Sequence, residues 1–152
     1  MRIVLWLIYM AVMVMPAFFI NPISENITGL QAICPVLYYV WSVSLIAALY
    51  RYAPKKNALF YASMAFLVIA CITPYSASQA GWINDIHIWF QVIGITLYSI
   101  LFIDRLPYSL PHFFIVLGTS FALMCLSGQV SGLCEIWFGL GIGLLNMKKT
   151  AA

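Results

Sequence analysis

The sequence predicts an all-α integral membrane protein, a single compact bundle of six transmembrane helices, and three observations lead to this fold class. Of its 152 residues, 64% are hydrophobic and only 7% are charged, and the mean hydropathy is +1.01. Soluble globular chains are about 45–50% apolar and about 25% charged. The apolar residues also form long runs, and the basic residues fall between alternate runs. Six spans of about 20 residues leave no room for an aqueous catalytic, nucleotide-binding or DNA-binding domain.

Each expected helix is an apolar run between polar breaks that carry turn-forming residues. The breaks include Pro54-Lys55-Lys56 and, as the weakest of them, Ser127-Gly128-Gln129. The first run is longer than the apolar region of a signal peptide and lacks a small-residue cleavage site, so we expect an uncleaved span. The predicted spans are 3–20, 29–50, 58–73, 82–103, 109–127 and 130–146.

The basic residues predict the orientation. Six spans place both termini on one side, and a cytoplasmic N-terminus puts every Lys and Arg on the cytoplasmic side, as the positive-inside rule requires. These residues are Arg2, Arg51, Lys55, Lys56, Arg105, Lys148 and Lys149. We therefore expect a multi-pass protein of a cell membrane, typically the bacterial inner membrane, with both termini cytoplasmic.

Polar side chains within the expected spans gather near the outer end. Glu135 and His87 are the leading candidates, because ionisable groups inside a span are costly and normally face the bundle interior. His87 shares one helical face with Gln91 and Tyr98, whereas Asp85 falls on another face with Trp82 and Trp89. The alternative for His87 and Glu135 is a purely structural hydrogen bond between helices. The candidate ligand-binding or proton-relay residues are Glu135, His87, Gln91, Asp85, Gln31 and Tyr98.

A stripe of small residues on the last span predicts a helix contact. Gly139 and Gly143 follow Glu135 at helical spacing and lead to Asn146. Small residues let two helix backbones approach closely, so this stripe should face another helix and turn Glu135 inward.

The sequence gives little support for a metal site or for redox catalysis by cysteines. His87 and His112 are expected at opposite ends of the bundle, so they cannot share a metal ion. No cofactor motif is present, and we expect no metal and no cofactor. Cys125 and Cys134 flank a short turn and form a possible disulfide, with buried free thiols as the alternative. No Cys-x-x-Cys pair is present to support redox catalysis.

Two segments carry a resemblance. Gly81-Trp82-Ile83-Asn84-Asp85-Ile86-His87 and Gly132-Leu133-Cys134-Glu135-Ile136-Trp137, within a six-span layout, resemble small six-helix bacterial membrane families of unknown function and, more distantly, DRAM-like membrane proteins. A His early in span four and an acidic residue early in span six recur in those groups. The resemblance implies roles for His87 and Glu135 and an integral membrane protein without established catalysis.

The function expected from these patterns is non-enzymatic. We expect an accessory or binding subunit that holds a lipid-like ligand or a partner helix in an outer-facing pocket between spans two, four and six. The alternatives are a proton-coupled small transporter acting as a dimer, a membrane-embedded lipid-modifying enzyme and a toxin-immunity protein. The expected partners are the lipid bilayer, a lipid-like ligand or a partner membrane protein, and not nucleic acid.

Overall fold

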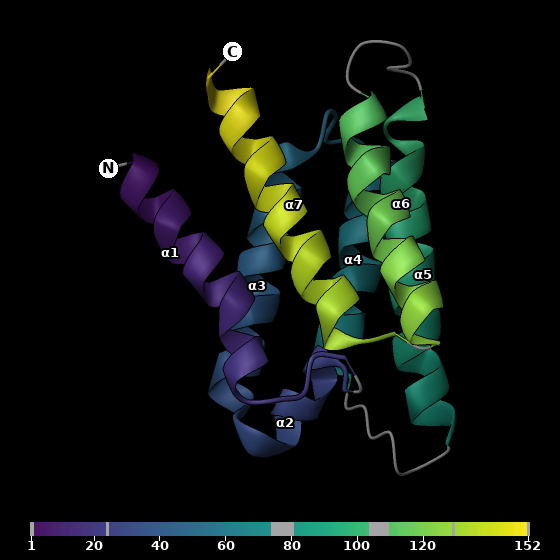
Figure 1. Cartoon of the computed structure of the whole chain (residues 1–152). Helices are drawn as coiled ribbons and strands as arrows, with labels where there is room; N and C mark the ends of the chain where they lie inside the picture. Colours follow the sequence, from purple (N-terminus) through teal and green to yellow (C-terminus); the bar gives the residue numbers. More distant parts are fainter. Residues whose placement is uncertain (1, 24, 74–80, 104–109, 129, 152) are drawn as a thin grey trace.

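The computed structural model is built from helices, and it describes residues 2–23, 25–73, 81–103, 110–128 and 130–151. Within these residues there are no strands. Each expected span contains one long helix, and short helices lie between the first two (Figure 1). The helices are α1 (Arg2–Val14), η1 (Met15–Phe18), η2 (Ile27–Gly29), α2 (Leu30–Ile33), α3 (Pro35–Tyr52), α4 (Ala58–Ile72), α5 (Trp82–Ile100), α6 (Leu110–Ser127) and α7 (Gly132–Ala151).

The prediction of six transmembrane helices is wrong. In the part of the chain that the structure describes, no helix combines the length and the apolarity that crossing a membrane requires. α1 has 13 residues and α4 has 15, or about 20 Å and 23 Å at 1.5 Å per residue, whereas a span needs about 20 residues. α5 is longer, but Asp85, His87 and Gln91 interrupt its apolar sequence. The same finding overturns the expected multi-pass membrane localisation.

Local sequence explains where several helices begin and end. α1 gives way to the 3-10 helix η1 because Pro16 cannot continue an α-helix from its interior. Pro35 occupies the first turn of α3, where its missing N–H costs nothing. The side chain of Asn57 caps α4, since its Oδ1 accepts the Phe60 N–H at 3.0 Å. Gly128 has a φ of +71° in the turn after α6, a conformation that glycine adopts without strain.

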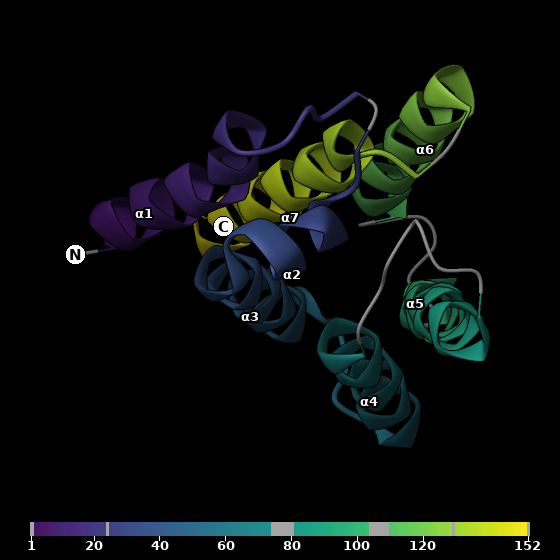
Figure 2. The ribbon, with the colours of Figure 1, turned by 90° about the horizontal axis from the view of Figure 1, so that it is seen from below.

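The helices pack as two pairs around α3. α4 packs along α5, α6 packs along α7, and α7 also contacts α1 and α3; Figure 2 shows the α4–α5 pair set to one side of the others. A buried aromatic cluster closes one end of the bundle. In it, Phe102 and Phe113 stack at 4.5 Å, and the Tyr98 hydroxyl donates to the Leu49 carbonyl at 2.7 Å.

The expected small-residue stripe on α7 is a helix contact. A Cβ atom at Gly139 or Gly143 would lie under 3.0 Å from the side chains of Met13 or Tyr9 on α1. The close approach permits two hydrogen bonds to α7 carbonyls: the Tyr9 hydroxyl donates to Gly139 at 2.8 Å, and the Trp6 indole donates to Gly143 at 3.2 Å. The stripe thus fixes the face of α7 that carries Glu135.

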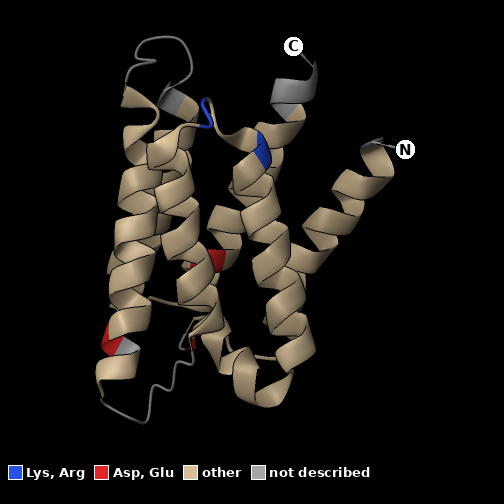
Figure 3. Ribbon diagram, turned by 180° about the vertical axis from the view of Figure 1, so that it is seen from behind, with Lys and Arg blue, Asp and Glu red and all other residues tan. Residues whose placement is uncertain are grey.

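Charged residues are sorted along the bundle. The two termini lie at one end (Figure 1). The described Lys and Arg lie toward this end, while Asp and Glu lie in the middle and at the opposite end (Figure 3). Arg105 falls outside the described residues, and the side chains of Arg2, Lys148 and Lys149 are not described either. The grouping of basic residues that the sequence predicts is therefore present in space for the described ones, and the other end of the bundle carries acidic groups.

Candidate functional site

Glu135 lies in the first turn of α7 and ties this helix to the loop between η1 and α2. Its Oε2 accepts the backbone N–H of Ile27 at 2.7 Å. Two backbone bonds join the same loop to the start of α7: Gly132 N–H donates to the Glu25 carbonyl and Leu133 N–H donates to the Pro22 carbonyl, both at 2.6 Å. Backbone hydrogen bonds from the loop to Glu135, and from the start of α7 to the loop, therefore fix the position of the Glu135 carboxylate.

The Glu135 carboxyl group is enclosed although the residue as a whole is half-buried. Burial raises its pKa from 4.5 to about 7, while the hydrogen bonds from Ile27 and from the Gln91 side chain act in the opposite direction. Burial disfavours the charged form, and hydrogen bonds to the carboxylate favour it. Glu135 can therefore exchange a proton or hold a cation near neutral pH.

A chain of polar side chains runs from α2 to α4 beside Glu135. The Tyr38 hydroxyl is hydrogen-bonded to the side chains of Ser42 and Gln31, and it donates to the Cys71 carbonyl at 3.1 Å. Ser42 is also hydrogen-bonded to the Cys71 thiol. The negative charge of Glu135 contributes to raised pKa values at both Tyr38 and Cys71, after burial as the larger cause. The charge of Glu135 therefore affects the proton affinity of Tyr38 and Cys71 in this polar chain.

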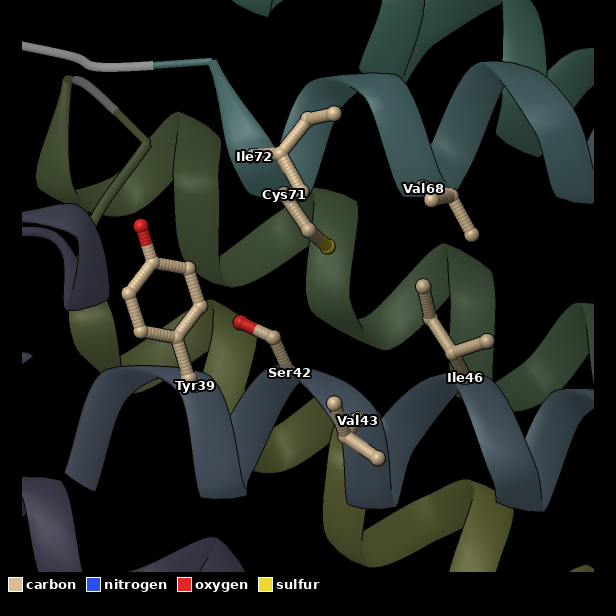
Figure 4. A pocket seen from close by; sticks show the side chains of 7 residues that line it. All are labelled: Tyr39, Ser42, Val43, Ile46, Val68, Cys71 and Ile72. Carbon is tan, nitrogen blue, oxygen red and sulfur yellow. The ribbon is translucent and has the colours of Figure 1, made fainter. Parts of the chain in front are cut away.

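An open groove of about 140 Å³ lies between α3 and α4, and Ser42 and Cys71 of this polar chain are among the residues that line it. Figure 4 shows its walls: one comes from α3 and the other from the last two turns of α4. The surface that the groove offers is apolar, because the buried Ser42 hydroxyl is engaged behind the wall. Its lining residues are Tyr39, Ser42, Val43, Ile46, Val68, Cys71 and Ile72.

The structure gives the two leading candidates, Glu135 and His87, different hydrogen-bond partners. Gln91 reaches Glu135, but the His87 ring is buried against the end of α4, where its Nδ1 lies 3.2 Å from the Thr73 carbonyl oxygen. Burial lowers the pKa of His87, and hydrogen bonds to the carbonyls of Thr73 and Ala70 oppose this. His87 therefore serves to dock α5 on α4.

The remaining candidates divide between core and surface. Tyr98 is fully buried in the aromatic cluster, far from the acidic end. Gln31 contacts Tyr38 and so belongs to the polar chain. Asp85 is exposed, as are Trp82 and Trp89 on the face that the sequence assigns to them. Gln31, Gln91 and Glu135 are the sequence candidates that the structure brings together.

All four cysteines are free thiols, so the Cys125–Cys134 bridge that the sequence allows is absent from the structure. Cys125 is exposed at the end of α6. Cys134 is buried, and its Sγ donates to the Ser131 carbonyl at 3.0 Å. Among the described residues, no three His, Cys, Asp or Glu side chains are grouped closely enough to hold a metal ion.

Sequence reasoning did not select three groups of the site: Tyr38, Ser42 and Cys71. Tyr38 and Ser42 are one helical turn apart on α3, and this spacing was the available signal. Nothing in the sequence places Cys71 opposite Ser42, because that contact depends on how α4 packs against α3. The backbone donor at Ile27 carries no sequence signature at all.

Comparison with known proteins identifies no relative: no family model, no curated protein and no solved structure matches the chain. The resemblance to six-helix bacterial membrane families and to DRAM-like proteins therefore stays a prediction.

The exterior of the bundle is strongly apolar. Large hydrophobic side chains are exposed on each of the long helices; Ile3, Val36, Trp82 and Leu126 expose 71–85% of their surfaces. Large exposed apolar patches are uncommon on monomeric soluble proteins. The groove between α3 and α4 is a concave site on this exterior that is backed by buried polar side chains.

Proposed function

We propose that this chain is a non-enzymatic binding protein that holds the apolar chain of a lipid-like ligand in the groove between α3 and α4. The observation that carries the proposal is an apolar groove backed by the buried polar chain of Tyr38, Ser42 and Cys71. Ligand sites are typically concave and mostly apolar, with a few fixed polar groups. The lipid surface itself is the proposed partner of the apolar exterior.

The volume of the groove limits the size of the ligand that it can hold. Small-molecule sites usually enclose about 300–1,000 Å³, and this groove has about 140 Å³. A fused ring system or a dinucleotide does not fit in that volume. A single unbranched hydrocarbon chain fits, because it can enter lengthwise and leave its remainder outside the open side.

The polar groups behind the groove favour binding over catalysis, because they are already hydrogen-bonded and the thiol is protonated. The Tyr38 hydroxyl is engaged by Ser42, Gln31 and the Cys71 carbonyl, and burial raises the pKa of the Cys71 thiol, which disfavours the nucleophilic thiolate. The ring of His87, the natural general base, is hydrogen-bonded to backbone carbonyls at the end of α4. The polar groups behind the groove are therefore engaged with one another, which favours binding over catalysis.

The test is protection of Cys71 from alkylation. Cys71 lines the groove and Cys125 is exposed elsewhere, so a ligand in the groove should slow alkylation of Cys71 and leave Cys125 unchanged, as followed by mass spectrometry. We expect single-chain amphiphiles to protect Cys71 at saturable concentration. Equal protection of both thiols, or of neither, would contradict binding in the groove.

A groove-filling substitution provides the matched comparison. Val43→Trp fills the groove from α3, whereas Val36→Trp changes the same residue type on the same helix outside it; both valines are exposed. Displacing two methylenes of a bound chain costs about 1.6 kcal/mol, so Val43→Trp should raise the Kd about tenfold. Val36→Trp should leave the Kd unchanged. Equal affinities of the two variants would place the ligand elsewhere.

A further inference from the structure

Three parts of the chain bring Lys and Arg to the same end of the bundle. These parts are the start of α1, the end of α3 with the loop after it, and the last turn of α7. Both termini lie at this end (Figure 1), and the described Lys and Arg lie toward it (Figure 3). We call this surface the basic end, and its residues are Arg2, Arg51, Lys55, Lys56, Lys148 and Lys149.

No acidic residue offsets these charges at the basic end among the described residues. The described acidic residues lie in the middle and at the opposite end of the bundle (Figure 3), and they are Glu25, Asp85 and Glu135. Glu135, in the first turn of α7, is about 20 Å from Lys148 along that helix, and charges further apart than about 8 Å are largely screened at physiological salt. Asp104 and Arg105 fall outside the described residues, and their formal charges cancel.

One charge of the basic end lies against an aromatic ring. The Lys56 ammonium is 3.8 Å from the centre of the Tyr50 ring, a distance at which the face of the ring attracts a cation. Tyr50 is exposed on α3, and Tyr61 is exposed about one turn into α4. Tyrosine suits the boundary between an apolar phase and water, because its ring is apolar and its hydroxyl is polar.

Exposed apolar side chains adjoin the charges on the other two segments as well. On α1, Ile3 and Val4 follow Arg2, and on α7 Met147 precedes Lys148. A soluble polyanion would contact the charges and leave these apolar side chains in water. An anionic lipid surface provides phosphate groups for the charges and acyl chains for the apolar side chains. The arrangement therefore fits a lipid surface better than a nucleic acid.

We propose that the basic end binds the anionic head groups of a lipid surface, so that the chain prefers surfaces that contain acidic phospholipids. This rests on the lipid surface proposed above as the partner of the apolar exterior, and it adds the class of lipid. Each Lys or Arg near an anionic surface typically strengthens binding about fivefold. Because exposed charges are screened by salt, this preference depends on ionic strength.

The experiment measures the vesicle concentration that floats half of the full chain in a density gradient. Phosphatidylcholine vesicles with and without phosphatidylglycerol are compared at 0.1 M and 1 M salt, between which the screening length falls from about 10 Å to about 3 Å. At 0.1 M salt we expect the anionic vesicles to act at a concentration at least about tenfold lower. At 1 M salt this preference should disappear while flotation itself persists.

Two exposed residues, Lys56 and Asp85, provide matched variants. Lys56→Gln should raise the half-flotation concentration of anionic vesicles about fivefold, whereas Lys56→Arg, which keeps the charge, should not. Lys56→Gln combined with Asp85→Asn restores the formal net charge of +3, and it should show the same fivefold loss, because only the removed Lys lies at the basic end. Circular dichroism verifies that each variant keeps its helices, and the comparison of vesicles with the wild type does not depend on them.

The outcomes separate this inference from the proposed function. Equal flotation on both kinds of vesicle at 0.1 M salt would overturn the anionic preference and leave the lipid surface as the partner. A wild-type preference in the double variant would assign the effect to net charge, and loss of the preference to a DNA duplex at equal phosphate concentration would assign the basic end to a soluble polyanion; either result overturns the inference. Absence of flotation on all vesicles would overturn the lipid surface together with this inference, while the groove ligand is tested separately by alkylation of Cys71.

Discussion

Glu135 couples the stability of the fold to pH. Its pKa of about 7 exceeds the unfolded value of about 4.5, so between these two pH values the folded chain binds the proton more tightly than the unfolded chain. The free energy of unfolding therefore falls as the pH rises from about 4.5 to about 7 and levels off above it. The slope from this group cannot exceed about 1.4 kcal/mol per pH unit.

We expect Glu135→Gln to remove this downward slope. The measurement is guanidinium unfolding of wild type and variant at several pH values between 5 and 8. The slope that remains in the variant should be upward below pH 6.5, because the lowered pKa of buried His87 makes the unfolded chain the stronger proton binder there. Parallel pH profiles for the two proteins would show that the Glu135 carboxyl does not change its proton affinity on folding.

At the scale of helices, close backbone approach holds α7 in place. A Cβ atom at Gly141 would lie 2.4 Å from Val116 Cγ1 and 2.8 Å from its Cγ2. Val116 is β-branched and has few rotamers, so it cannot move aside easily. We expect Gly141→Ala to lower the free energy of unfolding by about 1–3 kcal/mol, the usual cost of overpacking.

Gly118 provides the control for this substitution. It lies in α6, the partner helix of α7, and a Cβ atom there would meet nothing within 4 Å. We expect Gly118→Ala to raise the free energy of unfolding by up to about 1 kcal/mol, because alanine is the better helix former. If chemical denaturation shows a rise in the free energy of unfolding for both variants, helix propensity rather than the α6–α7 contact decides the outcome at Gly141. A fall at Gly118 as well would show that the loss at Gly141 is not specific to its contact with Val116.

The helices were more predictable than their lengths. The apolar runs and turn residues of the sequence located all six long helices, because each of these helices lies between polar breaks that carry turn-forming residues. Pro16 and Pro35 shortened the regular part of the first two runs, and hydropathy averaged along a run does not register such interruptions. Helices therefore lie within the residue ranges of the expected spans, but the prediction that these helices cross a membrane was wrong.

The site was predictable only where helical spacing defines it. Glu135 and Gln91 follow from polar positions on inward faces, since each lies on a helix whose apolar and polar faces differ. Their partners come from other segments: Ile27 contributes a backbone N–H and Cys71 a contact across two helices. Such pairings depend on tertiary packing, which one sequence without relatives does not encode in any local pattern.

At the scale of the whole molecule, the apolar exterior bears on the proposed lipid partner. A protein partner covers about 800 Å², whereas large apolar side chains are exposed on every long helix, from Val4 on α1 to Met147 on α7. Acyl chains can cover such a surface because they are fluid and have no fixed shape. The exposed Trp82 and Trp89 near the start of α5 suit the boundary between lipid and water.

We therefore expect the full chain, diluted out of detergent, to float with phosphatidylcholine vesicles in a density gradient. Flotation should persist when the salt concentration rises from 0.1 M to 1 M, because contacts between apolar surfaces are not screened, whereas charge contacts at the Lys and Arg end would be. The measurement compares the floated fraction at both salt concentrations for neutral and anionic vesicles. Flotation confined to anionic vesicles at low salt would assign lipid binding to the basic end of the bundle, and its absence from both kinds of vesicle would leave the exterior to a partner of another class.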